Sequence, residues 1–321
     1  MRYERTCRWA VQLYDPSWTE AAVIRALTRL PQLRDFQLVL YRVEPPFERS
    51  VGHTSIQLDL LSGLEKFSLS GVHIHLPRDI TSSLAGLIAK SPQLVHLEVK
   101  LGHYGISLET IPTLHDLLGK VPEDHPLQLT HLALNRTGIL IDSFTLPHLR
   151  SLVSLDLRNL PAPSIVIGFV ADPTSESLKW VCSTSDICTI LKQEGIYLKH
   201  LVVSDVGVFD YICSYSGLET LDLCSMSFNS VEESNTSART FYKFVLPQLA
   251  LSLQVLKVQP NQEGRWCFNP EDDFQSVGLS QCNKLRSLTV SLNSTSFVQS
   301  INFMNRVLHQ YKDNLDDAVC S

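Results

Sequence analysis

Residues Leu129–Leu134 (LTHLAL) and Leu152–Leu157 (LVSLDL) share the pattern Leu-x-x-Leu-x-Leu. The second and third leucines of this pattern are two residues apart, so on an extended strand their side chains point to the same face. The residue between them, Ala133 or Asp156, points to the opposite face. The pattern therefore predicts a short strand with one buried face and one solvated face.

The same pattern, with Val or Phe allowed at the apolar positions, recurs along most of the chain. Further copies begin at Leu33, Leu64, Leu94, Leu198, Leu218, Leu253 and Leu285, and a degraded copy begins at Leu178. From Leu33 to Leu285 there are 252 residues and nine intervals, which gives a mean period of 28 residues. That period falls within the roughly 20–29 residues typical of leucine-rich repeats. The individual spacings run from 20 to 35 residues, so the array is irregular.

Most of the segments between these copies have the apolar spacing of helices. Helices are expected at 18–30, 80–89, 111–118, 187–191 and 241–249, and Asp272-Asp273 is expected to begin another. Strands are expected at 36–38, 67–69, 97–99, 132–134, 155–157, 201–203, 221–223, 256–258 and 288–290. This alternation predicts an α/β fold: a leucine-rich-repeat solenoid (horseshoe) with parallel strands on the concave face and helices on the convex face.

The predicted domain organisation is a single irregular leucine-rich-repeat domain over residues 1–321. Segment 1–32 holds an N-terminal strand around Trp9 and a helix, 33–292 holds the repeats, and 293–321 forms a C-terminal closing helix and tail. No polar capping unit precedes Trp9, and a solenoid end without a cap exposes core surface. We therefore expect the N-terminal end to be truncated.

Composition limits the compartment and the class of partner. The net charge is -6, and Lys and Arg form no cluster, so neither nucleic acid nor an anionic membrane is expected as a partner. The eight cysteines include no CxxC pair, no secretory signal opens the chain, and no apolar run is long enough for a membrane span. The chain is expected to be intracellular, in the cytoplasm or nucleus, with reduced thiols.

No residue is predicted to be catalytic, to bind a cofactor or to ligate a metal. His73-Ile74-His75 has a spacing that metal sites use, but no carboxylate or cysteine cluster near it completes a ligand set. The glycine-flanked loop Gly102–Gly105 lacks the Gly-Lys-Ser/Thr ending that holds phosphate. An enzyme alternative, a parallel β-helix acting on carbohydrate, would be secreted and would show acidic clusters on consecutive rungs, and the sequence has neither feature.

The solvated strand face is the predicted binding surface, because solenoids use such extended faces to bind other proteins. We call each copy of the leucine pattern a phrase and count its positions from the first leucine. The candidate residues occupy the third, fifth and seventh positions of the phrases. The candidates are His96, Glu98, Lys100, His131, Asn135, Asp156, Arg158, His200, Asp222 and Lys257.

With its repeats laid out, the chain resembles fungal F-box and leucine-rich-repeat proteins. The resemblance is carried by Leu129–Leu134, by Leu152–Leu157, and by the irregular spacing and long helical connectors. It implies a protein-binding module that serves as the substrate-recognition part of an F-box-type ubiquitin-ligase receptor. The alternative is a free-standing repeat scaffold or inhibitor unrelated to ubiquitin, and in either case the protein partner is not identified by the sequence.

The sequence departs from this family in two ways. The Asn or Cys that usually follows the strand is found only as Asn293, and no F-box is evident. Leu76–Ile88 imitates the opening of an F-box, but strand phrases on both sides of it favour the helix of a repeat. A ligase adaptor is therefore expected as a partner only if an F-box lies upstream of Met1.

Overall fold

The chain packs as two compact units of strands and helices. The computed structural model describes residues 5–12, 17–41, 56–72, 78–101, 112–160, 182–226, 228–261, 264–269 and 272–292. The first unit comprises Met1–Ser154 with Leu160–Ile187, and the second comprises Leu155–Asn159 with Cys188–Ser321. The prediction of a single repeat domain is not tested by this division and stays a prediction.

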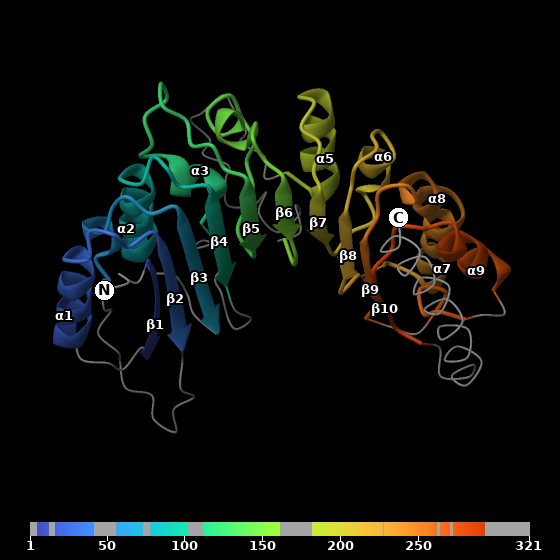
Figure 1. Ribbon diagram of the computed structural model, residues 1–321, viewed down its shortest axis with the longest axis horizontal. Coiled ribbons are helices and arrows are strands. Elements are labelled where there is room, and N and C mark those ends of the chain that lie inside the picture. Colours follow the sequence, from blue (N-terminus) through green and yellow to red (C-terminus); the bar gives the residue numbers. More distant parts are fainter. Residues whose placement is uncertain are drawn as a thin grey trace, which may run out of the picture. The chain divides into compact units, whose positions relative to one another are not determined.

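The strands follow one another in chain order (Figure 1). They are β1 Thr6–Gln12, β2 Asp35–Tyr41, β3 Lys66–Val72, β4 His96–Leu101, β5 His131–Asn135, β6 Ser154–Leu157, β7 His200–Val203, β8 Thr220–Cys224, β9 Val255–Gln259 and β10 Ser287–Val290. The pairs from β1 to β5 and from β7 to β10 are all parallel. All nine predicted strand segments lie within β2 to β10, so the prediction of an α/β fold with parallel strands is confirmed.

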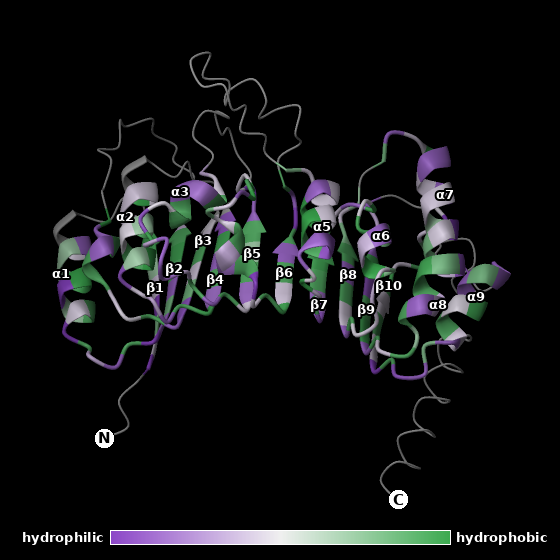
Figure 2. Cartoon of the chain, turned by 90° about the horizontal axis from the view of Figure 1, so that it is seen from above, coloured by the Kyte–Doolittle hydropathy of each residue, from purple (hydrophilic) through white to green (hydrophobic). Residues whose placement is uncertain are grey.

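Short helices connect the strands. They are α1 Ser17–Thr28, α2 Arg78–Ala89, α3 Leu114–Leu118, α5 Thr184–Gln193, α6 Phe209–Ile212, α7 Val231–Thr240, α8 Leu246–Leu249 and α9 Asp273–Ser280, with 3-10 turns η1 Leu58–Leu60 and η3 Leu146–Leu149 and the π-helix η4 Phe241–Val245. In the first unit, α1, α2 and α3 lie on one side of the strands (Figures 1 and 2).

Apolar residues at alternate strand positions form the core with the inner faces of the helices. In the first unit, Leu97 and Val99 of β4 are fully buried, and so are Leu84 and Ile88 of α2. This burial agrees with the interpretation of Leu76–Ile88 as the helix of a repeat, as far as its described residues show, because the apolar side of α2 is packed inside the unit. None of the described helices is long and apolar enough to cross a membrane.

One backbone contact recurs where successive phrases meet. In the first unit, the carbonyl oxygen of Arg34 accepts hydrogen bonds from the backbone N–H groups of both Glu65 and Lys66. The carbonyl oxygens of Arg5, Glu65, Val95 and Thr130 each accept the same two bonds from the next phrase, as do those of Lys199, Glu219 and Gln254 in the second unit. Each acceptor from Arg34 onwards follows the first leucine of its phrase. The phrases are thus equivalent in their main-chain hydrogen bonds as well as similar in sequence.

The helices differ from the prediction in several places, one of which is the short helix α6, which was not predicted. The helix expected at 111–118 is described only from Leu114, because Thr113 caps it: the Thr113 hydroxyl oxygen accepts a bond from the Asp116 backbone N–H at 3.1 Å. Segment 241–249 contains a π-helix before its last helical turn. The helix α7 was not predicted, because its residues are mostly hydrophilic (Figure 2) and only Ala238 is buried.

Several predicted features lie outside the described residues. They are the histidines of His73-Ile74-His75, the loop Gly102–Gly105, the start of the degraded copy at Leu178, and the closing segment 293–321.

Candidate protein-binding surface

In each unit, the outward positions of the strands carry most of the predicted binding residues. We call these positions the polar strand face of that unit. In the first unit the face consists of Thr6, Arg8, Ala10, Asp35, Gln37, Val39, Lys66, Ser68, Ser70, His96, Glu98, Lys100, His131, Ala133, Asn135 and Ser154. In the second unit it consists of Asp156, Arg158, His200, Val202, Ser204, Thr220, Asp222, Cys224, Val255, Lys257, Gln259, Ser287 and Thr289.

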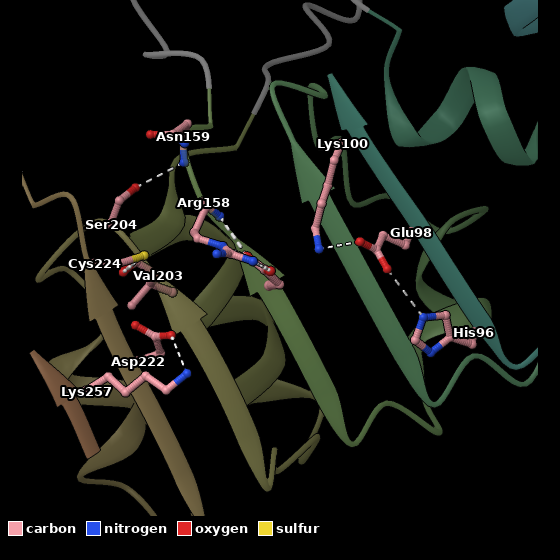
Figure 3. A network of polar contacts seen from close by, with 11 residues as sticks. His96, Glu98, Lys100, Arg158, Asn159, Val203, Ser204, Asp222, Cys224 and Lys257 are labelled. Atoms are coloured by element: carbon pink, nitrogen blue, oxygen red, sulfur yellow. Dashed lines mark hydrogen bonds and ion pairs between the residues drawn. The ribbon is translucent and has the colours of Figure 1, made fainter. Parts of the chain in front are cut away.

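Glu98 is the centre of the charged cluster on the first unit's face (Figure 3). Its carboxylate lies between two basic side chains of the same strand: Oε2 is 3.7 Å from His96 Nε2, and Oε1 forms an ion pair with Lys100 Nζ. The hydrogen bond with His96 lowers the pKa of Glu98 to about 2, with Lys100 adding to this effect against the opposing effect of burial. The two basic neighbours therefore favour the carboxylate form of Glu98.

Two histidines stack beside this cluster. His96 on β4 is in register with His131 on β5, and their ring centroids are 5.3 Å apart with an interplanar angle of 27°. The hydroxyl oxygen of Thr130 lies 2.8 Å from His131 Nδ1 and so fixes the orientation of that ring. Asn135 is in register with Lys100 at the other end of the same two strands. The structure thus brings together the five residues predicted on this unit's face.

In the second unit, Asp156 and Arg158 form a bidentate ion pair. Arg158 Nε donates to Asp156 Oδ1 at 2.9 Å, and Arg158 Nη2 donates to Oδ2 at 2.5 Å. This hydrogen bonding raises the pKa of Arg158 above its usual value, against the effect of burial. Planar pairing of this kind fixes both side chains in one orientation. A partner would therefore meet a preformed pair.

Asp222 differs from the prediction of a solvated side chain. It is buried, with 9% of its surface exposed, and burial raises its pKa even though Lys257 and Arg158 act in the opposite direction. Its Oδ2 lies 3.7 Å from Lys257 Nζ (Figure 3), and its Oδ1 has no hydrogen-bond partner among the described residues. Cys224, the next outward residue on β8, is buried as well. Neighbouring side chains therefore enclose Asp222 and Cys224 on β8, where the sequence predicted a solvent-exposed surface.

The remaining candidate, His200, pairs with a neighbouring strand. Its Nδ1 lies 3.0 Å from the hydroxyl oxygen of Thr220, which is in register with it on β8.

Two outward basic residues were missed by the sequence analysis. Arg8 on β1 and Lys66 on β3 are both exposed, and both lie on the same face as Glu98 and Lys100. Lys66 is the third residue of the phrase that begins at Leu64, which is the position that gave His96 and His131. The third position of this phrase therefore carries the same signal as the third positions that predicted His96 and His131.

The thiols of Cys188, Cys224 and Cys282, on the described part of the chain, are buried. Burial raises the pKa of the Cys188 and Cys282 thiols to about 12 and that of Cys224 to about 11, so these thiols are protonated and poor nucleophiles. Among the described residues, no group of three or more His, Cys, Asp or Glu side chains could hold a metal ion.

Comparison with known proteins adds no family assignment: no protein-family model matches the sequence, and no curated protein matches it.

The ion pairs of Glu98 predict a specific pH dependence. Because folding lowers the pKa of Glu98 from 4.5 to about 2, its charged form stabilises the fold fully above pH 4.5. We expect Glu98→Gln to lower the free energy of unfolding at neutral pH by about 1–2 kcal/mol, after allowance for solvent screening. This difference should shrink as the pH falls from 4.5 toward 2.

Urea unfolding at several pH values measures this effect. Ser68→Ala, which changes a neutral residue in register with Glu98, is the control and should give a difference from the native protein that is independent of pH. A loss of stability for Glu98→Gln that stays constant across the same pH range would show that the ion pairs contribute nothing.

Proposed function

We propose that this chain is a leucine-rich-repeat solenoid that binds another protein through its polar strand faces and performs no catalysis. The repeated phrases and the repeated main-chain contact between them support the solenoid. On this proposal the strands line a concave face and the helices a convex one, and the protein acts in the cytoplasm or nucleus. The partner is a protein, and neither nucleic acid nor a membrane.

The observation that carries the binding function is the alignment of charged side chains on the outward strand positions. A sheet face with no function needs only solvated polar residues, whereas here Glu98, Asp156 and Asp222 are each held at least partly buried beside a basic side chain. Placing carboxylates in partly buried positions costs stability unless they are paired. Such fixed charges are suited to selecting a complementary partner.

We further propose, from the resemblance to F-box and leucine-rich-repeat proteins, that the bound protein is a ubiquitin-ligase substrate. In that arrangement an F-box docks onto a ligase adaptor while the repeats hold the substrate. The α2 segment is unsuited to docking, because Leu84 and Ile88 are fully buried and would be released only by unfolding the repeat. Adaptor binding therefore requires an F-box ahead of the repeats.

The experiment is affinity capture of partner proteins from an extract of the source cells, with identification by mass spectrometry. The double variant Glu98→Lys/Lys100→Glu exchanges the two charges, so the ion pair is kept while the pattern seen by a partner is inverted. We expect the specific partner to be lost from this variant. It should be retained by Lys192→Glu, which changes an exposed residue of α5.

Two controls complete this experiment. Circular dichroism checks that both variants are folded. Purified ligase adaptor, added separately, should be retained only by a gene product in which an F-box precedes the repeats. Equal capture of the partner by the exchanged variant and the native chain would contradict binding through the strand face.

A further inference from the structure

In all three charged clusters of the polar strand faces, the acid lies deeper than the base. The Glu98 side chain is 21% exposed and its partner Lys100 is 34% exposed. The corresponding pairs in the second unit are Asp156 at 13% with Arg158 at 37%, and Asp222 at 12% with Lys257 at 44%. Formal charges cancel within each of these pairs, but an approaching molecule meets the ammonium or guanidinium group first.

The first unit adds two bases that have no ion-pair partner among the described residues. Arg8 and Lys66 are exposed, and neither forms an ion pair with any residue that the structure describes. Lys66 is in register with His96 and, on the other side, with Asp35, which is half-buried. Exposed basic groups therefore outnumber exposed acidic groups on this face, although the whole chain carries a net charge of -6.

We propose that the polar strand face of the first unit binds a segment of the partner protein that is rich in Glu and Asp. This inference rests on the proposed function and specifies the chemistry of the partner. The Lys100 ammonium group has three N–H donors, and Glu98 is its only ion-pair partner among the described residues, so it has further donors to offer carboxylates of the partner. The side chains of Lys66 and Arg8 form no ion pair with other described residues, and Glu98 on β4 holds Lys100 in place.

The acids on this face argue against a nucleic-acid partner. Glu98 and Asp35 lie between the bases, on β4 and β2, so a continuous line of phosphates crossing the strands would pass over both of them. Nucleic-acid interfaces have instead a strong excess of positive charge along the phosphate path. A protein segment can place its carboxylates opposite Arg8, Lys66 and Lys100 and leave neutral residues opposite the acids.

The test measures binding of a fluorescein-labelled peptide of alternating Glu and Ser to the full chain by fluorescence anisotropy. The same peptide with Gln in place of Glu, and with Lys in place of Glu, serves as the neutral and basic probe, and a single-stranded oligonucleotide serves as the polyanion control. We expect binding of the Glu peptide only, and weaker binding as salt is added, because exposed ion pairs are screened.

A matched pair of double variants locates the site. Arg8→Glu/Lys66→Glu should weaken binding of the Glu peptide roughly tenfold, which is about what the loss and inversion of two exposed ion pairs supplies. Arg25→Glu/Arg29→Glu makes the same change in net charge at exposed residues of α1 and the turn after it, and binding should change less than about twofold.

Three outcomes would overturn the inference. They are equal weakening by both double variants, preference for the Lys or Gln peptide, and tighter binding of the oligonucleotide than of the Glu peptide. If the captured partner protein still depends on the strand face while the Glu peptide does not bind, only the acidic chemistry is wrong. If the partner is insensitive to the strand face, the proposed function itself fails.

Discussion

Replacing Leu132 with alanine should lower the free energy of unfolding by about 2–5 kcal/mol, because the change removes buried methyl groups and leaves a cavity. Leu132 is 2% exposed and lies in β5 at the second apolar position of its phrase. Leu221, at the same position of β8, is fully buried, and Leu221→Ala should cost a similar amount in the second unit. Urea or thermal unfolding of the purified variants measures both effects.

The control for these variants is Leu251→Ala. Leu251 is 71% exposed and lies in the turn before β9, so truncating it removes little buried surface, and stability should change by less than about 0.5 kcal/mol. If Leu132→Ala or Leu221→Ala lost less than about 1 kcal/mol, that leucine would not be a core residue, and the repeat pattern would not define the buried face.

The second large effect is expected at Gly278 in α9. This glycine packs against the π-helix, and a Cβ at position 278 would lie well under 3.0 Å from the backbone carbonyl oxygen of Tyr242. Tyr242 is fully buried beside Trp266, with ring centroids 6.2 Å apart, so its backbone cannot move away freely. The two segments touch here because position 278 has no side chain.

Gly278→Ala should therefore destabilise the second unit by about 1–3 kcal/mol, as overpacking does. Alanine has a higher helix propensity than glycine by about 1 kcal/mol, so the two effects have opposite signs, and the sign of the measured change shows which is larger. Val277→Ala is the control, because Val277 is an exposed neighbour in the same helix. A stabilised Gly278→Ala variant would mean that α9 does not pack closely on Tyr242.

The sequence was sufficient to predict the strands, because each phrase carries its own apolar alternation and the array repeats it. The helix α7 shows where this approach fails. Only Ala238 of α7 is buried, so apolar spacing gives no signal there. A capping signal was nevertheless present: the Ser230 hydroxyl oxygen accepts a bond from the Glu233 backbone N–H, and the Glu233 side chain accepts one from the backbone N–H of Asn229.

The sequence pattern predicts which residues lie on the polar strand faces, but it does not predict how deeply each of them is buried. Alternation places Glu98, Asp156 and Asp222 on the outward face, yet burial of an outward residue depends on its neighbours across the sheet. Asp222 is enclosed beside Lys257 and Cys224. Glu20 of α1 is a second charged residue whose burial the pattern does not reveal, because it is only 4% exposed. Such burial depends on contacts between repeats, which the pattern of a single repeat does not contain.

The carbonyl oxygen that accepts two N–H groups from the next phrase has a consequence for how such a chain can diversify. The two hydrogen bonds at that point are made by main-chain atoms, so they do not depend on the identity of the adjoining side chain. The connector between two junctions can also gain or lose residues at small entropic cost, in keeping with spacings of 20 to 35 residues. On the proposed function, point substitutions at outward positions can then change which partner is recognised while the main-chain junctions between the strands are kept.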